Sequence, residues 1–211
     1  MKKGLIGYYD YTVVLTYCGL IFAATGIFLA FSGAILAALT CLMISGICDV
    51  FDGTVAHTKQ RSESERCFGI QIDSLSDLVS FGVLPGMIVY CMLDYSIAAG
   101  VVSAVFILCA LIRLAYFNVL EAERQQQTTE RRSSYLGLPV TTIAILLPLV
   151  HLFYYYGFFS AKIVFPILLL IVAAFFVAPI NVTKPHGSKK AVLCVFGLIV
   201  LGLTIFQMVS A

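Results

Sequence analysis

The sequence from residue 33 to residue 56 reads GAILAALTCLMISGICDVFDGTVA, and almost all of it is apolar. About 20 mostly apolar residues are enough for a helix to cross the hydrocarbon core of a bilayer. Two acidic residues, Asp49 and Asp52, lie near the end of the run. Charged groups in a membrane segment are costly and usually functional. The run therefore predicts a transmembrane helix with a functional acidic pair near one membrane face.

The rest of the chain has the same character. Of its 211 residues, 61% are hydrophobic and 11% are charged, whereas soluble domains carry about 25% charged residues. A soluble fold of this length cannot bury so much apolar surface. Spanning helices are predicted over residues 12–31, 33–56, 70–93, 96–118, 138–157, 160–180 and 190–209. We therefore expect an all-α, polytopic transmembrane helix bundle that forms a single integral membrane domain over residues 1–211.

Basic residues orient the predicted bundle. With the amino terminus in the cytoplasm, all 13 Lys and Arg residues except Lys162 and Arg113 fall on the cytoplasmic side. Cytoplasmic loops of membrane proteins are enriched in these residues. Three longer polar loops, 57–69, 119–136 and 181–190, share that side, so we expect the active site to face the cytoplasm. Seven spans place the carboxyl terminus outside, and the number becomes six if 190–209 lies along the surface.

A second acidic pair, Asp73 and Asp77, opens the third segment. Its members are four residues apart, and Asp49 and Asp52 are three apart, so each pair shares one helix face. The two segments are consecutive and antiparallel, so the pairs should meet at the cytoplasmic face. Four carboxylates together repel one another, and Mg²⁺, Mn²⁺ or Ca²⁺ would relieve the repulsion. Helix capping is the alternative explanation, because an acid in a first helical turn is favourable.

A longer pattern surrounds the two acidic pairs. It reads Asp49-Val-Phe-Asp52-Gly53-Thr-Val-Ala56-His57 and, after an eleven-residue gap, Gly69-Ile-Gln-Ile-Asp73-Ser-Leu-Ser-Asp77. The pattern resembles the signature of the CDP-alcohol phosphotransferase family, which is D-x-x-D-G-x-x-A-R followed by G-x-x-x-D-x-x-x-D. Members of this family are helical membrane proteins. The resemblance implies a six-helix core, to which the C-terminal part of the chain, 181–211, would add a further helix.

Three further motifs resemble the phosphatidylserine synthase subgroup of that family. They are Asp73-Ser-Leu-Ser-Asp77-Leu-Val-Ser80-Phe81-Gly82-Val-Leu-Pro85, Arg113-Leu-Ala-Tyr-Phe-Asn118 and Gly137-Leu138-Pro139. Two positions depart from the pattern. His57 replaces an arginine that lies near the phosphates of the nucleotide in the family, and Tyr116 replaces the second arginine of R-L-A-R-F-N. Histidine is shorter and mostly neutral at pH 7, so the first departure bears on nucleotide affinity.

The resemblance implies an activity. The hydroxyl of L-serine would attack the lipid-side phosphorus of CDP-diacylglycerol, giving phosphatidylserine and CMP with the help of two Mg²⁺ or Mn²⁺ ions. The metal ligands would be Asp49, Asp52, Asp73 and Asp77, of which Asp77 would also accept the proton of the hydroxyl. The donor site would comprise Gly53, Ala56, His57, Arg66 and Gly69. The acceptor and phosphate site would comprise Ser80, Gly82, Arg113 and Asn118. The resemblance further implies membrane lipid as surroundings, a homodimer, no nucleic-acid partner, and the plasma membrane of a bacterium or archaeon.

Other interpretations of the same residues stay open. A sister enzyme could use glycerol 3-phosphate or inositol phosphate, although the extra phosphate would favour more basic residues near Arg113 than Tyr116 supplies. Arg113 could instead form a structural ion pair with an aspartate. A divalent-metal transporter would place its acids near the bilayer midplane or in a broken-helix repeat. A catalytically silent paralogue that scaffolds other enzymes is compatible with His57.

Overall fold

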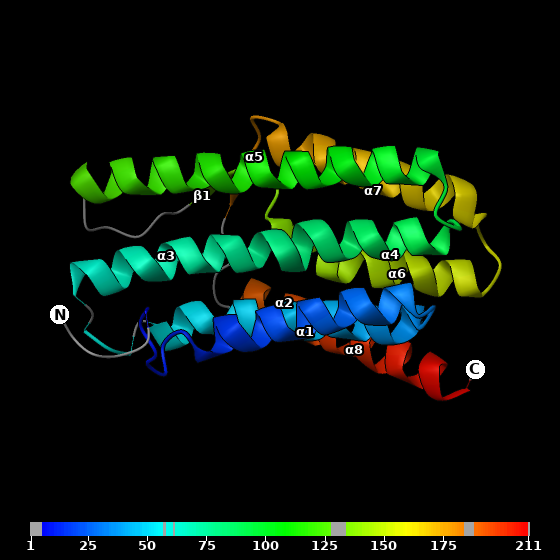
Figure 1. The fold of residues 1–211 in the computed structure, drawn as a ribbon, viewed down its shortest axis with the longest axis horizontal. Helices are drawn as coiled ribbons and strands as arrows, with labels where there is room; N and C mark the ends of the chain where they lie inside the picture. The colour runs from blue at the N-terminus through cyan, green and yellow to red at the C-terminus, as the bar shows by residue number, and fades with distance from the viewer. Residues whose placement is uncertain (1–5, 57, 61, 128–133, 184–187, 211) are drawn as a thin grey trace.

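Figure 1 shows the computed structural model, which describes residues 6–56, 58–60, 62–127, 134–183 and 188–210 as an up-and-down bundle of helices. Each of the seven predicted segments is helical. The elements are α1 (Val14–Phe31), α2 (Ile35–Ala56), α3 (Glu63–Asp77), η1 (Leu78–Val83), α4 (Leu84–Met92), α5 (Ile97–Gln127), β1 (Ser134–Leu136), η2 (Val140–Thr142), α6 (Ile143–Tyr155), α7 (Ala161–Val177), β2 (Asn181–Thr183) and α8 (Ser188–Ser210).

Five stretches are long and apolar enough to cross a membrane. They are Val14–Phe31, Ile35–Val55, Glu63–Met92, Ile97–Glu123 and Val192–Ser210. Two more apolar helices, Val140–Tyr155 and Ala161–Val177, are shorter than these. The predicted all-α, polytopic membrane bundle is therefore confirmed, and of its seven predicted spans five reach spanning length among the described residues.

The short joints between helices lie at the predicted boundaries between spans. Gly33 and Gly157 have φ angles of +80° and +78°, and Asp94 and Tyr95 have φ angles of +54° and +58°. Glycine adopts this left-handed region at little cost, and it reverses the chain at the end of a helix. These joints lie at one end of the bundle, opposite the end where α3 begins and α5 ends (Figure 1).

Two predicted boundaries are wrong, because polar helical turns extend beyond the apolar runs. The helix predicted from residue 70 begins at Glu63, and α5 runs to Gln127 rather than to residue 118. At the start of α3 the Glu65 backbone N–H donates to Ser62 Oγ over 3.2 Å, and the Ser62 N–H donates to Glu65 Oε2 over 2.8 Å. This reciprocal pair is a capping box, which stabilises a helix start in a polar surrounding. The predicted loops 57–69 and 119–136 are accordingly shorter.

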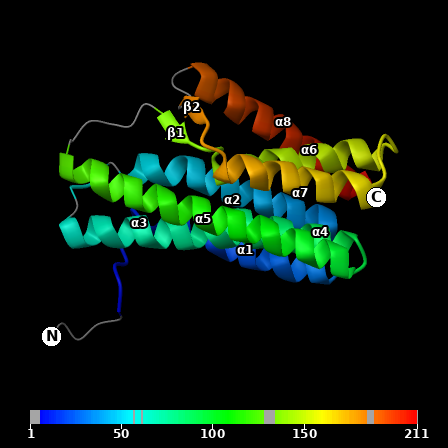
Figure 2. The same ribbon diagram turned by 90° about the horizontal axis from the view of Figure 1, so that it is seen from above.

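A short antiparallel ribbon is the one feature of the described chain that departs from the all-α prediction. Strand β1 pairs with β2, with Ser134 opposite Thr183 and Leu136 opposite Asn181. Gly137 follows β1, and its N–H donates to the carbonyl of Ile180 over 2.8 Å. The ribbon thus ties the chain before α6 to the chain after α7 (Figure 2).

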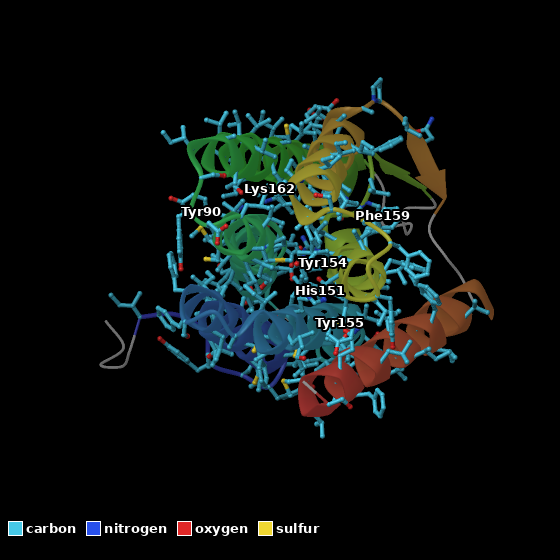
Figure 3. All side chains as sticks on the ribbon, turned by 90° about the vertical axis from the view of Figure 1, so that its right-hand side faces the viewer. Tyr90, His151, Tyr154, Tyr155, Phe159 and Lys162 are labelled. Carbon is cyan, nitrogen blue, oxygen red and sulfur yellow. The ribbon has the colours of Figure 1, made fainter. Side chains whose placement is uncertain are left out.

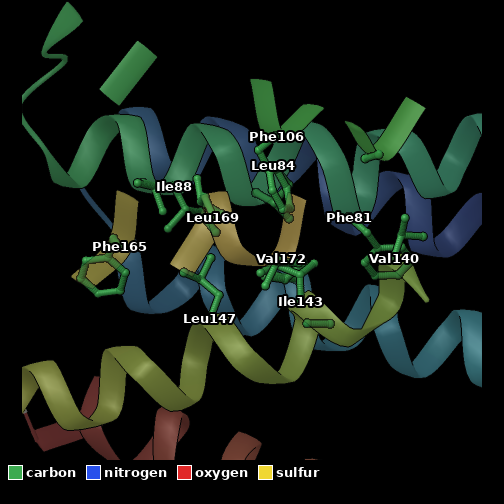
Figure 4. Close-up of a cluster of buried hydrophobic side chains, with 14 of the residues drawn as sticks. Phe81, Leu84, Ile88, Phe106, Val140, Ile143, Leu147, Phe165, Leu169 and Val172 are labelled. Atoms are coloured by element: carbon green, nitrogen blue, oxygen red, sulfur yellow. The ribbon is translucent and has the colours of Figure 1, made fainter. Parts of the chain in front are cut away.

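The core is built around α4, which contacts α1, α2, α5, α6 and α7. Its side chains Leu84 and Ile88 are fully buried, and they meet Phe106 from α5 and Leu169 from α7 (Figure 4). Helix α8 packs on α2 and α6 at the edge of the bundle, as the end view of Figure 3 shows. This arrangement holds α2 between α1 and α8, with the acidic end of α2 beside α3.

Candidate functional site

Three carboxylates gather where the end of α2 lies beside α3. One carboxylate oxygen from each of Asp49, Asp52 and Asp73 lies within 4.8 Å of the other two. Asp52 is buried, with 9% of its surface exposed. Carboxylate oxygens are the ligands that hard divalent cations prefer. Three such anionic atoms at this spacing, in a poorly hydrated place, fit one or more divalent cations.

Asp77 lies one helical turn beyond Asp73 and is not part of this set of three. With Asp49 and Asp52 it lines an adjoining cavity between α1, α2 and the α3–η1 junction. The cavity also has a polar lining, formed by the side chains of Thr16, Ser45, Ser76 and Ser80. Asp77 therefore faces a small hydroxyl-lined space next to the carboxylate cluster.

Thr16 on α1 is a site residue that the sequence analysis missed. Its hydroxyl donates a hydrogen bond to Asp52 Oδ2 over 3.1 Å, and both residues are buried. The carbonyl of Thr16 accepts a hydrogen bond from the Ser76 hydroxyl over 3.3 Å. The available signal was weak, because Thr16 is an uncharged residue in an apolar run. Only its spacing of three residues from Gly19, which places both on one helix face, could have indicated it.

The predicted donor residues lie around the end of α2 and the first turns of α3. Gly53 follows Asp52, and a Cβ added there would meet no atom within 4 Å, so the position is open. Arg66 is exposed, Gly69 is half-buried, and Ala56 is the last residue of α2. His57 lies outside the described residues.

Lys59, between α2 and α3, is held by two acids. Its Nζ lies 2.6 Å from Asp10 Oδ2 and 3.3 Å from Glu65 Oε1. Hydrogen bonds from Lys59 and then Thr12 lower the pKa of Asp10 to about 2, and the bond to Asp10 raises the pKa of Lys59. The ammonium group of Lys59 thus joins the segment before α1 to the α2–α3 connection.

The predicted acceptor residues Ser80 and Gly82 lie in η1, a π-helical turn inside the long third segment. Ser80 is buried and lines the same cavity as Asp77. Gly82 does not line this cavity. A Cβ added there would lie 3.1 Å from Leu78 Cδ1 and 3.4 Å from Ala110 Cβ. Gly82 therefore allows α5 to pack closely against η1. π-helical turns are frequent at functional sites.

Arg113 and Asn118 lie on α5. The guanidinium carbon of Arg113 lies 5.8 Å from the centre of the Phe117 ring. Arg113 also lines a pocket between α5 and α7, together with Tyr116, Phe117 and Phe176–Pro179. Asn118 Oδ1 accepts a hydrogen bond from the Ser74 hydroxyl over 2.9 Å. Asn118 thus ties α5 to the acidic helix α3, whereas Arg113 lines the pocket between α5 and α7.

The family match covers the whole site. Residues 12–179 match the family model described as CDP-alcohol phosphatidyltransferase. This range begins just before α1 and ends just after α7, so it contains all four aspartates, and α8 lies beyond it.

Curated relatives from three kinds of organism are similar to this chain. It is 39% identical over 108 residues to the CDP-diacylglycerol–serine O-phosphatidyltransferase of Saccharomyces cerevisiae, over 50% of this chain and 38% of that protein. It is 33% identical over 135 residues to the archaetidylserine synthase of Methanothermobacter thermautotrophicus, over 64% and 53%. It is 33% identical over 138 residues to the CDP-diacylglycerol–serine O-phosphatidyltransferase of Helicobacter pylori, over 61% and 54%. The chain thus spans about half of these relatives' length or less.

Proposed function

This chain belongs to the CDP-alcohol phosphatidyltransferase family, and from that premise we propose that it transfers a phosphatidyl group from CDP-diacylglycerol to the hydroxyl of L-serine. The products are phosphatidylserine and CMP. The observation that carries this function is the cluster of Asp49, Asp52 and Asp73 next to the cavity that Asp77 lines. The relatives are two CDP-diacylglycerol–serine O-phosphatidyltransferases and an archaetidylserine synthase, and these activities support the choice of acceptor.

The proposed cofactor is a pair of Mg²⁺ or Mn²⁺ ions. Asp49, Asp52 and Asp73 would hold them, and Asp77 would also contact the second ion. When bound, the ions supply positive charge that neutralises the pyrophosphate of the donor and the charge that develops during displacement. The donor's nucleotide would lie over Gly53, where the chain leaves open space, with Ala56, His57, Arg66 and Gly69 around it.

Asp77 is the proposed general base. In this reaction the serine oxygen bonds to the lipid-side phosphorus, and the bond from that phosphorus to the bridging oxygen breaks, so that CMP leaves with the bonding electrons. The serine hydroxyl must lose its proton as it attacks, and a carboxylate within hydrogen-bond reach can accept that proton. Asp77 suits this role because it stands beside the three-carboxylate cluster and faces the hydroxyl-lined cavity that also holds Ser80.

Arg113 is the proposed partner of the serine carboxylate. Arginine pairs with carboxylates through two parallel hydrogen bonds. Among the described residues that line the α5–α7 pocket, Arg113 is the only basic one, while Tyr116 and Phe117 supply aromatic surface. A single cation suits an acceptor with one carboxylate better than glycerol 3-phosphate or inositol phosphate, which also carry a phosphate dianion. Gly82 would contribute by letting α5 approach, and Asn118 by fixing α5 to α3.

A panel of acceptors tests this function. Purified protein in detergent would receive radiolabelled CDP-diacylglycerol, a divalent cation, and serine, glycerol 3-phosphate or inositol phosphate in separate reactions. We expect CMP release and a labelled lipid in the reaction with serine and in neither of the other two. Release of CMP with glycerol 3-phosphate and none with serine would contradict the proposed acceptor.

We also propose that the carboxylate cluster faces the cytoplasm of a bacterial or archaeal cell and that the chain forms a homodimer. Cys67 offers a native reporter of orientation, because it is exposed near the start of α3 at the end of the bundle that carries the acids. In a variant that keeps only this cysteine, a membrane-impermeant maleimide should label inside-out vesicles and leave intact cells unlabelled. Labelling of intact cells would contradict the orientation, and cross-linking in membranes would test the dimer.

A further inference from the structure

Thr16 forms hydrogen bonds with both of the helices that carry the aspartates. Its hydroxyl donates to Asp52 Oδ2 on α2 over 3.1 Å. Its carbonyl accepts from the hydroxyl of Ser76, which lies on α3 between Asp73 and Asp77, over 3.3 Å. Thr16, Asp52 and Ser76 are all buried, with 8%, 9% and 6% of their surfaces exposed. One residue of α1 thus contacts Asp52 on α2 and the turn of α3 that separates Asp73 from Asp77.

The close approach of α1 to α2 makes the contact with Asp52 reachable. A Cβ added at Gly19 would lie 3.4 Å from Cys48 Cβ, and one added at Gly26 would lie 3.0 Å from Cys41 Cβ. The hydroxyl of Ser45 donates to the carbonyl of Gly19 over 2.8 Å, which adds a polar link between the two helices. Small residues let membrane helices pack closely, and a side chain as short as threonine then spans the gap to Asp52.

We propose that Thr16 is a positioning residue for the metal-binding carboxylates. The inference rests on the metal site of the proposed function. A carboxylate can accept about four hydrogen bonds or metal contacts. The Thr16 hydroxyl uses one of these positions on Oδ2, which fixes the rotation of the Asp52 carboxylate and leaves the others for a cation. The bond from Ser76 to the Thr16 carbonyl fixes α3 against α1, and with it the position of Asp73 relative to Asp52. Groups that orient metal ligands in this way typically change metal affinity ten- to a hundredfold when they are removed.

Mn²⁺ binding tests the inference without reference to turnover. Purified full-length protein in detergent would be titrated with Mn²⁺ alone, and free Mn²⁺ would be followed by its electron paramagnetic resonance signal. Thr16→Val keeps the shape of the side chain and removes the hydroxyl, and it should weaken Mn²⁺ binding by about ten- to a hundredfold. Thr16→Ser keeps a hydroxyl at this position. Its Mn²⁺ affinity should lie within about threefold of that of the native protein, a much smaller change than the one expected for Thr16→Val.

The matched control is Thr25→Val. Thr25 lies on the exposed face of the same helix, and its hydroxyl donates to the Ile21 carbonyl within α1. The same substitution there should leave Mn²⁺ binding unchanged. Native-like Mn²⁺ affinity in Thr16→Val would overturn the positioning role, as would equal losses in Thr16→Val and Thr25→Val.

Two further variants separate the possible failures. Asp52→Asn removes a proposed metal ligand. If it binds Mn²⁺ as the native protein does, the metal site itself is wrong. If it loses binding while Thr16→Val does not, only the role of Thr16 is wrong. Should Thr16→Val fail to fold, Ser76→Ala tests the same junction from α3, where it removes the bond to the Thr16 carbonyl. It should weaken Mn²⁺ binding severalfold, and unchanged binding would overturn the inference.

Discussion

The hydroxyl of Ser74 donates a hydrogen bond to Oδ1 of Asn118 over 2.9 Å, and this bond joins α3 to α5 one residue away from Asp73. Helix α5 also carries Arg113, five residues before Asn118. The Ser74–Asn118 bond therefore ties α5, which carries the proposed acceptor residue, to the helix that carries Asp73 and Asp77.

A double-mutant cycle tests this bond. Ser74→Ala and Asn118→Ala should each lower kcat/KM for serine by roughly two- to tenfold, because a neutral hydrogen bond contributes about 0.5–1.5 kcal/mol. The double variant should be no worse than the poorer single variant, because both remove one interaction. Ser103→Ala is the control, since it removes an α5–α4 bond to the Gly86 carbonyl away from the acids. Purely additive losses would show that the two residues act separately.

The bundle and the meeting of the acidic pairs follow from sequence because both depend on local patterns. Apolar length predicts the helices, and a spacing of three or four residues predicts a shared face. The ribbon between 134–136 and 181–183 depends on pairing distant residues, which no local pattern encodes. The position of Asp77 outside the set of three follows from helix geometry, since four residues rise about 6 Å along the axis. Thr16 was not predicted as a site residue because it is uncharged.

Replacing single aspartates tests the metal site. Asp49→Asn and Asp73→Asn should each lower kcat by at least about a hundredfold, because a lost ligand costs more than a lost supporting group. Asp94→Asn is a suitable control, because Asp94 lies in the α4–α5 turn with a φ of +54°, which asparagine tolerates. The assay would be repeated with a chelator and with metal analysis of the protein. Full turnover by protein that retains no metal would contradict a metal-dependent reaction.

Gly137 and Gly157 form a matched pair for testing the close approach of Gly137, at the end of the ribbon, to α7. Their φ angles are +79° and +78°, but a Cβ at Gly137 would lie 2.7 Å from the Phe176 carbonyl oxygen, whereas one at Gly157 would meet nothing within 4 Å. Alanine at Gly157 should cost about 1–2 kcal/mol of stability through its backbone alone. Alanine at Gly137 should cost more and should also raise the serine KM, since Phe176 lines the α5–α7 pocket. Thermal unfolding in detergent would measure the first effect, and equal losses at the two positions would argue against the contact.

The pair Asp10–Lys59 should make stability depend on pH. The folded-state pKa of Asp10 is lowered from 3.8 to about 2, first by its hydrogen bond with Lys59. A carboxyl with a lowered pKa stabilises the fold above its ordinary pKa, and the contribution is lost as the pH falls toward the folded value. Asp10→Asn should therefore lower the unfolding temperature near neutral pH and have a shrinking effect as the pH approaches 2. Glu63→Gln, at an exposed acid on the same end of the bundle, is the control, and an equal effect of Asp10→Asn at every pH would contradict the ion pair.

His57 stands where the family pattern has an arginine, and the nearest described cation along the chain is already engaged. Lys59 is bound by Asp10 and Glu65, so it is poorly placed to replace that arginine at the donor's phosphates. An arginine at position 57 would add a permanent charge and a bidentate fork. A charge-assisted hydrogen bond contributes about 1.5–3 kcal/mol, and each 1.4 kcal/mol is a tenfold change. His57→Arg should therefore lower the KM for CDP-diacylglycerol about ten- to a hundredfold and leave the serine KM nearly unchanged.

His57→Ala and Arg66→Met, assayed alongside, show which native side chain contacts the phosphates of the donor. If neither substitution at position 57 alters donor kinetics while Arg66→Met raises the donor KM, the contact belongs to Arg66, and His57 lies outside the nucleotide site.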